Sequence, residues 1–226
     1  MNSIDVMFKD WACSFSGCDG GNPEGDWFCG IEFGTGDIRG EKDHTPEEYE
    51  QSVKNYYLQE LNEEIQAGPV LLAKSFNLSK NTQYPFGLKL AKLYAVIKGN
   101  NLQDHKKFAE QCKGEEIFKI NLYPIPFADT DQEHWKKYEL DKLTGLETKQ
   151  AYMTWCAINR FPAFADKVRE YGPKLILGCG LTFLTEFFMC FAGERGAEHI
   201  NYKRLEADGN SRDLYWTSWS LEFRVH

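Results

Sequence analysis

Residues 27–36, Trp27-Phe28-Cys29-Gly30-Ile31-Glu32-Phe33-Gly34-Thr35-Gly36, carry the pattern that decides the fold. The first five are a short apolar run, typical of a buried strand, and the next five form a glycine-bearing turn. Two further apolar runs occupy residues 117–123 and 174–178, with segments of helical periodicity between them. Because strands that alternate with helices build parallel sheets covered on both faces, this order predicts an α/β fold.

The helices have recognisable starts and stops. Thr45-Pro46-Glu47-Glu48 is a capping box with proline at the first helical position, and apolar residues recur every four from Tyr49 to Ile65. Further helices are predicted over residues 86–98, 147–159, 162–171 and 181–191. From residue 215 to 225 the odd positions are mostly apolar, which predicts a half-exposed strand. We therefore expect a three-layer α/β/α sandwich with a central, mainly parallel, four-stranded sheet.

Composition narrows the class of protein. The chain has 226 residues without repeats or linkers, which predicts a single domain over residues 1–226. Its formal net charge of -8 argues against a general coating of nucleic acid but permits a local basic groove. There is no apolar run of the ~20 residues that span a bilayer and no visible secretory signal, so a cytoplasmic protein without membrane contact is expected. The seven scattered cysteines are expected to be free thiols.

The first candidate site is the turn after the strand at residues 27–31. Ligands of open α/β sheets bind at the carboxyl ends of strands, and Gly30, Gly34 and Gly36 would let the backbone approach one closely. Glu32 on this turn can orient or deprotonate a water molecule. The alternative interpretation is a tight turn with a solvated glutamate, because no G-x-G-x-x-G fingerprint is present.

Residues 81–86, Asn-Thr-Gln-Tyr-Pro-Phe, form an aromatic loop ahead of a predicted helix. Exposed rings such as Tyr84 and Phe86 can stack on an unpaired or extruded base. The alternative is that these rings cap the hydrophobic core.

Two other patterns carry less weight. Residues 175–180, Leu-Ile-Leu-Gly-Cys-Gly, resemble the first motif of methyltransferases, but only 46 residues follow Gly180, too few for the remaining strands. Cys13 and Cys18 are one loosely spaced pair without a second pair nearby, whereas structural zinc sites usually have two. Neither a metal nor a cofactor is expected.

Four segments, in this order, resemble the uracil-DNA glycosylase superfamily. Residues 30–34, Gly-Ile-Glu-Phe-Gly, are similar to its first motif, Gly-x-Asn-Pro-Gly or Gly-x-Asp-Pro. Residues 81–86 are similar to the loop whose ring stacks the extruded base. Residues 120–124, Ile-Asn-Leu-Tyr-Pro, are similar to the Thr-Asn-Leu signature, and residues 171–180 to a Pro-Lys-x-Ile-x-x-x-Gly strand and the helix after it. The resemblance spans about residues 26 to 192.

The resemblance implies a DNA glycosylase that extrudes a deaminated, uracil-type base and hydrolyses its N-glycosidic bond. By this resemblance Glu32 positions the water, Phe33 or Phe86 stacks on the base with Tyr84 nearby, and Asn121 reads the base edge. The implied partner is single- or double-stranded DNA in a local groove. Glu32 and Asn121 are expected at the carboxyl ends of neighbouring strands, facing one cleft.

The chain departs from the family pattern in two places. Glu32 and Phe33 replace the usual Asn or Asp and the usual Pro. The second motif, His-Pro-Ser or Asn-Pro-Ser, has only His226 as a possible counterpart. These departures, with the acidic charge, favour an alternative: a non-catalytic module that binds a nucleobase, nucleic acid or protein on the same fold.

Overall fold

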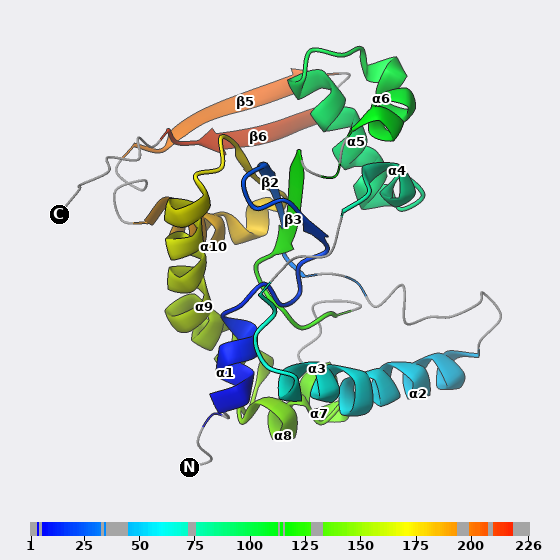
Figure 1. Ribbon diagram of the computed structural model, residues 1–226, viewed down its shortest axis with the longest axis vertical. Helices are drawn as coiled ribbons and strands as arrows, with labels where there is room; N and C mark the ends of the chain where they lie inside the picture. The colour runs from blue at the N-terminus through cyan, green and yellow to red at the C-terminus, as the bar shows by residue number, and fades with distance from the viewer. Residues whose placement is uncertain are drawn as a thin grey trace.

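The computed structural model describes residues 4, 6–32, 34, 45–71, 76–112, 114, 116–127, 133–193, 199–207 and 210–218. At its centre is a four-stranded sheet with the strand order β1-β3-β2-β4 (Figure 1). The strands are β1 (Gly20–Gly21), β2 (Asp26–Gly30), β3 (Ile117–Asn121) and β4 (Ile176–Gly178). β2 is parallel to both β3 and β4, and β1 is antiparallel to β3. The predicted α/β class and mainly parallel four-stranded sheet are confirmed.

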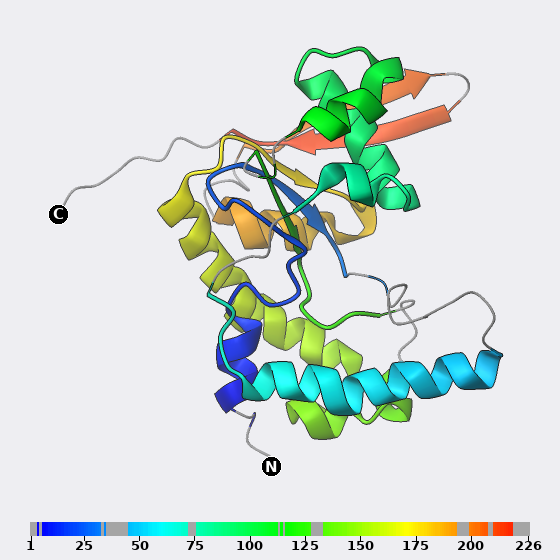
Figure 2. The same cartoon turned by 45° about the vertical axis from the view of Figure 1, so that its right-hand side comes forward.

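The helices frame this sheet at both ends of the molecule. Toward the end that holds the N-terminus lie α1 (Val6–Ala12), α2 (Pro46–Tyr56), η2 (Tyr57–Leu61), α3 (Asn62–Gln66), α7 (Glu133–Lys137) and α8 (Leu140–Thr144). Toward the other end lie α4 (Leu78–Asn81), α5 (Pro85–Ile97), η3 (Leu102–Asp104) and α6 (His105–Gln111). Figures 1 and 2 show this separation from two directions. The capping box is present, because Glu48 N donates to Thr45 Oγ1 and Thr45 N donates to the Glu48 carboxylate.

Side chains of β2 and β3 alternate between two hydrophobic clusters, one on each face of the sheet. Trp27, Phe118 and Ile120 pack with α1, with α9 (Lys149–Tyr171) and with η5 (Phe188–Ala192). Phe28 and Ile117 pack on the opposite face with side chains of α5 and α6. Helices therefore cover both faces of the sheet, as the alternation of strands and helices predicts.

The structure differs from two of the helix predictions. The segments expected as two helices, 147–159 and 162–171, form the single helix α9 with Pro162 inside it. Its buried face runs past the proline without a break, from Tyr152 through Phe161 to Val168. Because Pro162 itself faces solvent, burial of this face outweighs the backbone hydrogen bond that proline removes. The helix predicted over 181–191 is divided into η4 (Leu181–Phe183), α10 (Leu184–Phe187) and η5.

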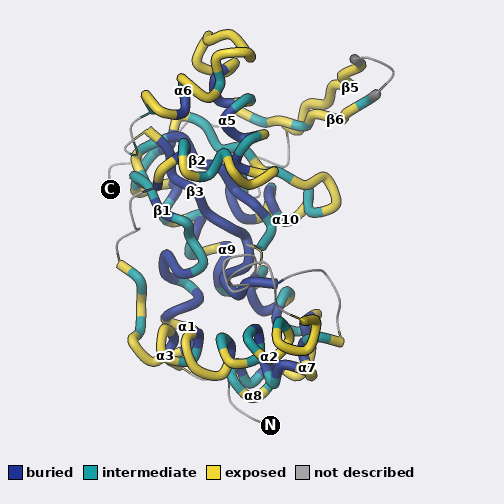
Figure 3. Tube along the Cα trace, turned by 90° about the vertical axis from the view of Figure 1, so that its right-hand side faces the viewer, coloured by how far each residue is buried: buried dark blue, intermediate teal, exposed yellow. Residues whose placement is uncertain are grey.

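The C-terminal part of the chain also differs from its prediction. The strand expected over residues 215–225 is β6 (Asn210–Trp216), which pairs with β5 (Asn201–Ala207) in an antiparallel hairpin. Cross-strand pairs such as Tyr202 and Tyr215, whose ring centroids are 5.0 Å apart, set its register. Figure 3 shows that this hairpin is mostly exposed, and residues 219–226 lie outside the described part of the chain.

No helix in the described residues combines the length and apolar character that would cross a lipid bilayer.

Candidate functional site

The carboxyl ends of β2 and β3 lie side by side, as predicted. Gly30 is opposite Asn121, and beyond the strands Leu122 N donates to Gly30 O at 3.0 Å. Tyr123 N donates to Ile31 O, also at 3.0 Å, so the segments that follow β2 and β3 stay paired up to the residue before Glu32. Glu32 and Asn121 therefore leave neighbouring strands at the same edge of the sheet.

Glu32 is paired with a lysine that sequence analysis did not single out. Lys149 Nζ lies 3.2 Å from Glu32 Oε1 and donates to Oε2 at 3.3 Å. The side chain of Glu32 is only 9% exposed and that of Lys149 only 1%, so the alternative of a solvated glutamate is wrong. The ammonium also lies 3.8 Å from the ring centroid of Phe127. The carboxylate is thus held in a fixed, largely desolvated position.

Lys149 is placed there by the start of α9. Thr148 is the N-cap of this helix, and its hydroxyl accepts a hydrogen bond from Ala151 N at 3.0 Å. Lys149 is the first helical residue, so its backbone position is tied to the cap. No local sequence signal distinguishes this lysine, because its partner is 117 positions earlier.

Three buried tyrosines lie close enough to Glu32 for its charge to affect their pKa. Burial raises the pKa of Tyr57, Tyr123 and Tyr152, and the negative charge of Glu32 raises each of them further. Tyr57 donates its hydroxyl to Pro126 O, and Tyr152 OH accepts from Ile125 N at 3.1 Å. These neutral hydroxyls hold the segment that follows β3 in place. Among the described residues, the cation that pairs with Glu32 is Lys149.

Asn121 is held more tightly than a residue on a free loop. It is 2% exposed, and its Nδ2 donates to Gly17 O at 2.8 Å. A Cβ atom at Gly30 would lie 2.6 Å from Asn121 Oδ1, so only glycine leaves this amide undisturbed. Oδ1 accepts no hydrogen bond within the described part of the chain. The amide thus keeps one acceptor open beside a glycine.

Arg160 fixes the backbone around Asn121, a role the sequence did not reveal. It is 0% exposed, and it donates to Leu122 O at 2.8 Å, to Asn121 O at 3.1 Å and to Ser16 O at 3.0 Å. A further bond goes to Ala12 O. Its described hydrogen-bond partners are carbonyl oxygens and one serine hydroxyl. The guanidinium clamps the segment before β1 to the end of β3.

The predicted stacking residue Phe86 lies near the face of β3 that carries Asn121. Lys119 lies two residues before Asn121 on that strand, and its Nζ lies 5.1 Å from the Phe86 ring centroid and forms an ion pair with Asp19. Alternation along a strand puts Lys119 and Asn121 on one face. Phe86 and Tyr84 are 38% and 45% exposed, so the alternative that they cap the core is not what is observed.

The remaining predicted residues are only partly described. Gly34 is exposed, whereas Phe33, Gly36 and His226 lie outside the described residues. The structure brings together Gly30, Asn121 and, through Lys119, Phe86. Glu32 contacts α9, and Asn121 contacts the segment before β1. That both side chains face one cleft stays a prediction.

The cysteines show no ligand geometry where the structure describes them. All seven are free thiols, as predicted, and no group of three or more potential ligands is found within the described ranges. Burial raises the pKa of Cys18 and of Cys156 to about 12, which is the opposite of what a metal-binding thiolate needs.

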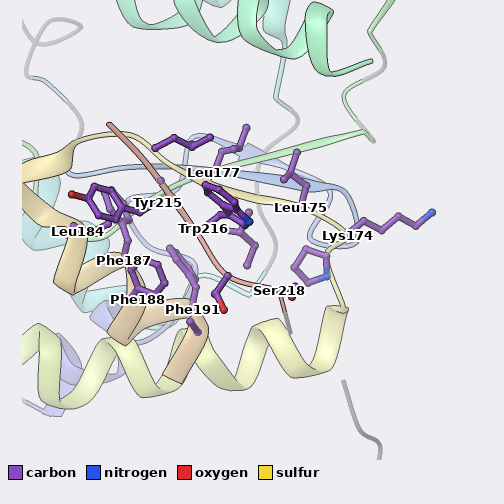
Figure 4. Close-up of a pocket in the computed structure, with 16 residues that line it drawn as sticks. Lys174, Leu175, Leu177, Leu184, Phe187, Phe188, Phe191, Tyr215, Trp216 and Ser218 are labelled. Carbon is purple, nitrogen blue, oxygen red and sulfur yellow. The ribbon is translucent and has the colours of Figure 1, made fainter. Parts of the chain in front are cut away.

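A separate apolar cavity of about 570 Å³ lies along β4 (Figure 4). Leu175, Leu177, Phe187, Phe191 and Trp216 are among the residues that line it. It follows the length of β4, and neither Cys179 nor Gly180 of the methyltransferase-like turn is part of its lining. None of the residues predicted for the glycosylase-like site lines it either.

Comparison with protein-family models, with curated proteins and with solved structures finds no match to this chain.

Proposed function

We propose that this protein is a DNA glycosylase-like enzyme of the uracil-DNA glycosylase type, which hydrolyses the N-glycosidic bond of a deaminated base flipped out of DNA. The observation that carries the proposal is the edge of the sheet where Gly30 and Asn121 lie opposite each other and Glu32 follows. Extended resemblance to one superfamily across four segments supports it.

Asn121 and Phe86 have complementary tasks in this proposal. Asn121 Nδ2 is already bound to Gly17, so its open Oδ1 accepts the N3–H of a uracil-type base. The missing side chain of Gly30 is what lets this oxygen lie so close to β2. Phe86 contacts Lys119, which is on the same face of β3 as Asn121. Its exposed ring stacks on the base.

Glu32 serves the bond-breaking step. The C1′–N bond breaks with its electron pair going to the base, and the carboxylate stabilises the positive charge that develops on the sugar. Water then bonds to C1′, and the proton it loses passes to the carboxylate or to the departing base. Lys149 holds the carboxylate in place through both steps.

The second candidate, a non-catalytic module that binds a nucleobase, nucleic acid or protein, also has an observation in its favour. Glu32 already has Lys149 as a charged partner, and both side chains are almost completely buried. Buried ion pairs commonly have only a structural role. In this case the fold would keep a base-binding edge at Asn121 without hydrolysis.

Hydrolysis of uracil from single- and double-stranded DNA tests the proposal. Glu32→Gln keeps the size of the side chain and should lower the single-turnover rate by ~10²–10⁴-fold. Glu24→Gln, on an exposed turn, is the matched control and should keep the wild-type rate. Because Glu32→Gln leaves Lys149 buried without its anion, the Glu32→Gln/Lys149→Met variant shows whether any loss comes from unfolding.

Two results would contradict the proposal in different ways. Full activity in Glu32→Gln removes Glu32 from the mechanism. Absence of hydrolysis by the intact protein, together with binding of uracil-containing DNA that depends on Asn121, identifies the non-catalytic module instead.

A further inference from the structure

Lysines are concentrated in the segment that builds α4, α5 and α6. Residues 76–112 contain six lysines and two acidic residues, a net charge of +4 in a chain of net charge -8. The six are Lys80, Lys89, Lys92, Lys98, Lys106 and Lys107. An acidic protein therefore carries one strongly basic block, which we call the lysine block.

Most of these lysines have no acidic partner. Lys98 pairs with Asp26 at 2.9 Å, whereas the other five form no ion pair with any described residue. Several lysines in other parts of the chain do have acidic partners: Lys136 pairs with Asp141 and Lys142 with Glu139, both at 2.7 Å. Lys80, Lys89, Lys106 and Lys107 are also exposed, so their charge faces solvent. Such a group repels itself unless an anion neutralises it.

The opposite end of the molecule has the reverse charge. Residues 46–66, which form α2, η2 and α3, contain six glutamates and one lysine. All six glutamates are exposed. Figures 1 and 2 place these helices and the lysine block at opposite ends. A polyanion is therefore drawn to one end of the molecule and repelled from the other.

The lysine block contains the aromatic residues of the proposed site. Tyr84 precedes α5, and Phe86 is its second residue. Lys89 and Lys92 follow on the same helix, ~4.5 and ~9 Å along its axis from Phe86. Proteins that bind single-stranded nucleic acid combine exposed rings, which stack on bases, with cations along the backbone. Phosphates flanking a base stacked on Phe86 would come within reach of these ammonium groups.

We propose that the lysine block is the surface that binds a single strand of nucleic acid, with Lys89, Lys92, Lys106 and Lys107 neutralising its phosphates. The inference rests on the proposed function in that Phe86 receives the extruded base, but the binding itself requires no hydrolysis. The strand runs from Phe86 over α5 and α6, away from the glutamates of α2 and α3.

Exposed apolar side chains on the same helix suggest a different partner, an anionic lipid surface. Leu93, Val96 and Ile97 are 44%, 52% and 42% exposed beside Lys89 and Lys92. Basic amphipathic helices bind membranes through such faces. We favour nucleic acid because Tyr84 and Phe86 lie next to the lysines and because Phe86 connects through Lys119 to the face of Asn121.

The test measures binding of a labelled, uracil-free single strand of about 16 nucleotides by fluorescence anisotropy between about 50 and 200 mM salt. Lys89→Gln/Lys92→Gln should weaken binding roughly tenfold or more at the lower salt and reduce the slope of log K against log salt by about 1.4, close to 0.7 for each lysine. Lys106→Gln/Lys107→Gln should act in the same way. Lys9→Gln/Lys142→Gln changes the net charge equally at the opposite end and should leave the slope unchanged.

Equal slopes in all three double variants would overturn the inference. Lysine-dependent binding to vesicles containing phosphatidylserine, without binding to the oligonucleotide, would also overturn it in favour of the membrane. The test is independent of catalysis. Lysine-dependent binding without uracil hydrolysis supports the inference and contradicts the proposed enzyme. Hydrolysis that does not depend on these lysines supports the proposed enzyme and contradicts the inference.

Discussion

Gly30 and Asn121 show how one missing side chain shapes the candidate site. Asn121 is almost fully buried, and its amide occupies the space that a Cβ on Gly30 would take. The glycine is required by this close approach across two parallel strands, whereas the sequence motif pointed to close approach of a ligand.

Gly30→Ala should therefore displace the Asn121 side chain and break its bond to Gly17 O. We expect a loss of about 1–3 kcal/mol in the free energy of unfolding, measured with urea, because overpacking and a broken buried hydrogen bond both act. In an Asn121→Ala background the same substitution should cost much less, since the clashing atom is gone. Additive costs would show that Asn121 is not what excludes a side chain at residue 30.

Lys149 and Arg160 are the residues that sequence reasoning missed. A lysine or an arginine on an amphipathic helix is usually read as solvated, yet Lys149 is 1% and Arg160 0% exposed. Each is buried because it meets oxygen atoms from distant segments, the carboxylate of Glu32 and the carbonyls around Asn121. Neither contact follows from local periodicity.

At the scale of elements, α9 carries both of these residues. To do so, this helix has to continue past Pro162. Pro162 has no N–H to donate to Ile158 O, and both residues are on the solvent side. The buried face of α9 is what maintains the helix there.

Pro162→Ala should restore that hydrogen bond and raise the free energy of unfolding by about 1–2 kcal/mol. Pro46→Ala is the matched control, because Pro46 is at the first position of α2, where proline is well tolerated, and should give no gain. Thermal and urea unfolding of both variants check this. A loss of stability in Pro162→Ala would mean that the proline ring itself packs favourably.

At the scale of the whole molecule, buried thiols make stability depend on alkaline pH. Burial raises the pKa of Cys18 and Cys156 from 9.0 to about 12, and it also raises the pKa of Cys29 and Cys190. Above pH 9 the unfolded chain releases these protons while the folded chain keeps them. The unfolded state then binds fewer protons, so stability decreases as the pH rises.

The free energy of unfolding should therefore fall between pH 9 and 12, by about 1.4 kcal/mol per pH unit for Cys18 and again for Cys156. Urea unfolding at a series of pH values measures the slope. Cys156→Ala should reduce this slope by about 1.4 kcal/mol per pH unit. Any change in packing that it causes shifts the stability equally at every pH and does not alter the slope. A stability that stays level from pH 8 to pH 10 would contradict the prediction.

The sequence by itself determined the local elements and their order. Apolar runs at residues 27–31, 117–123 and 174–178 became β2, β3 and β4, and the capping box at Thr45 starts α2 as predicted. Parallel pairing of β2 with β3 also followed, because the intervening helices return the chain in one direction. These features depend on neighbouring residues and on short-range chain geometry.

Only the tertiary structure decided which side chains meet. It added the two-residue strand β1, and it joined Glu32 to Lys149 across 117 positions and Arg160 to Asn121 O across 39. It also placed the lysine block and the glutamates of α2 and α3 at opposite ends of the molecule. Such contacts depend on where the folded chain brings distant segments, and burial of a charge becomes favourable only once its partners are in place.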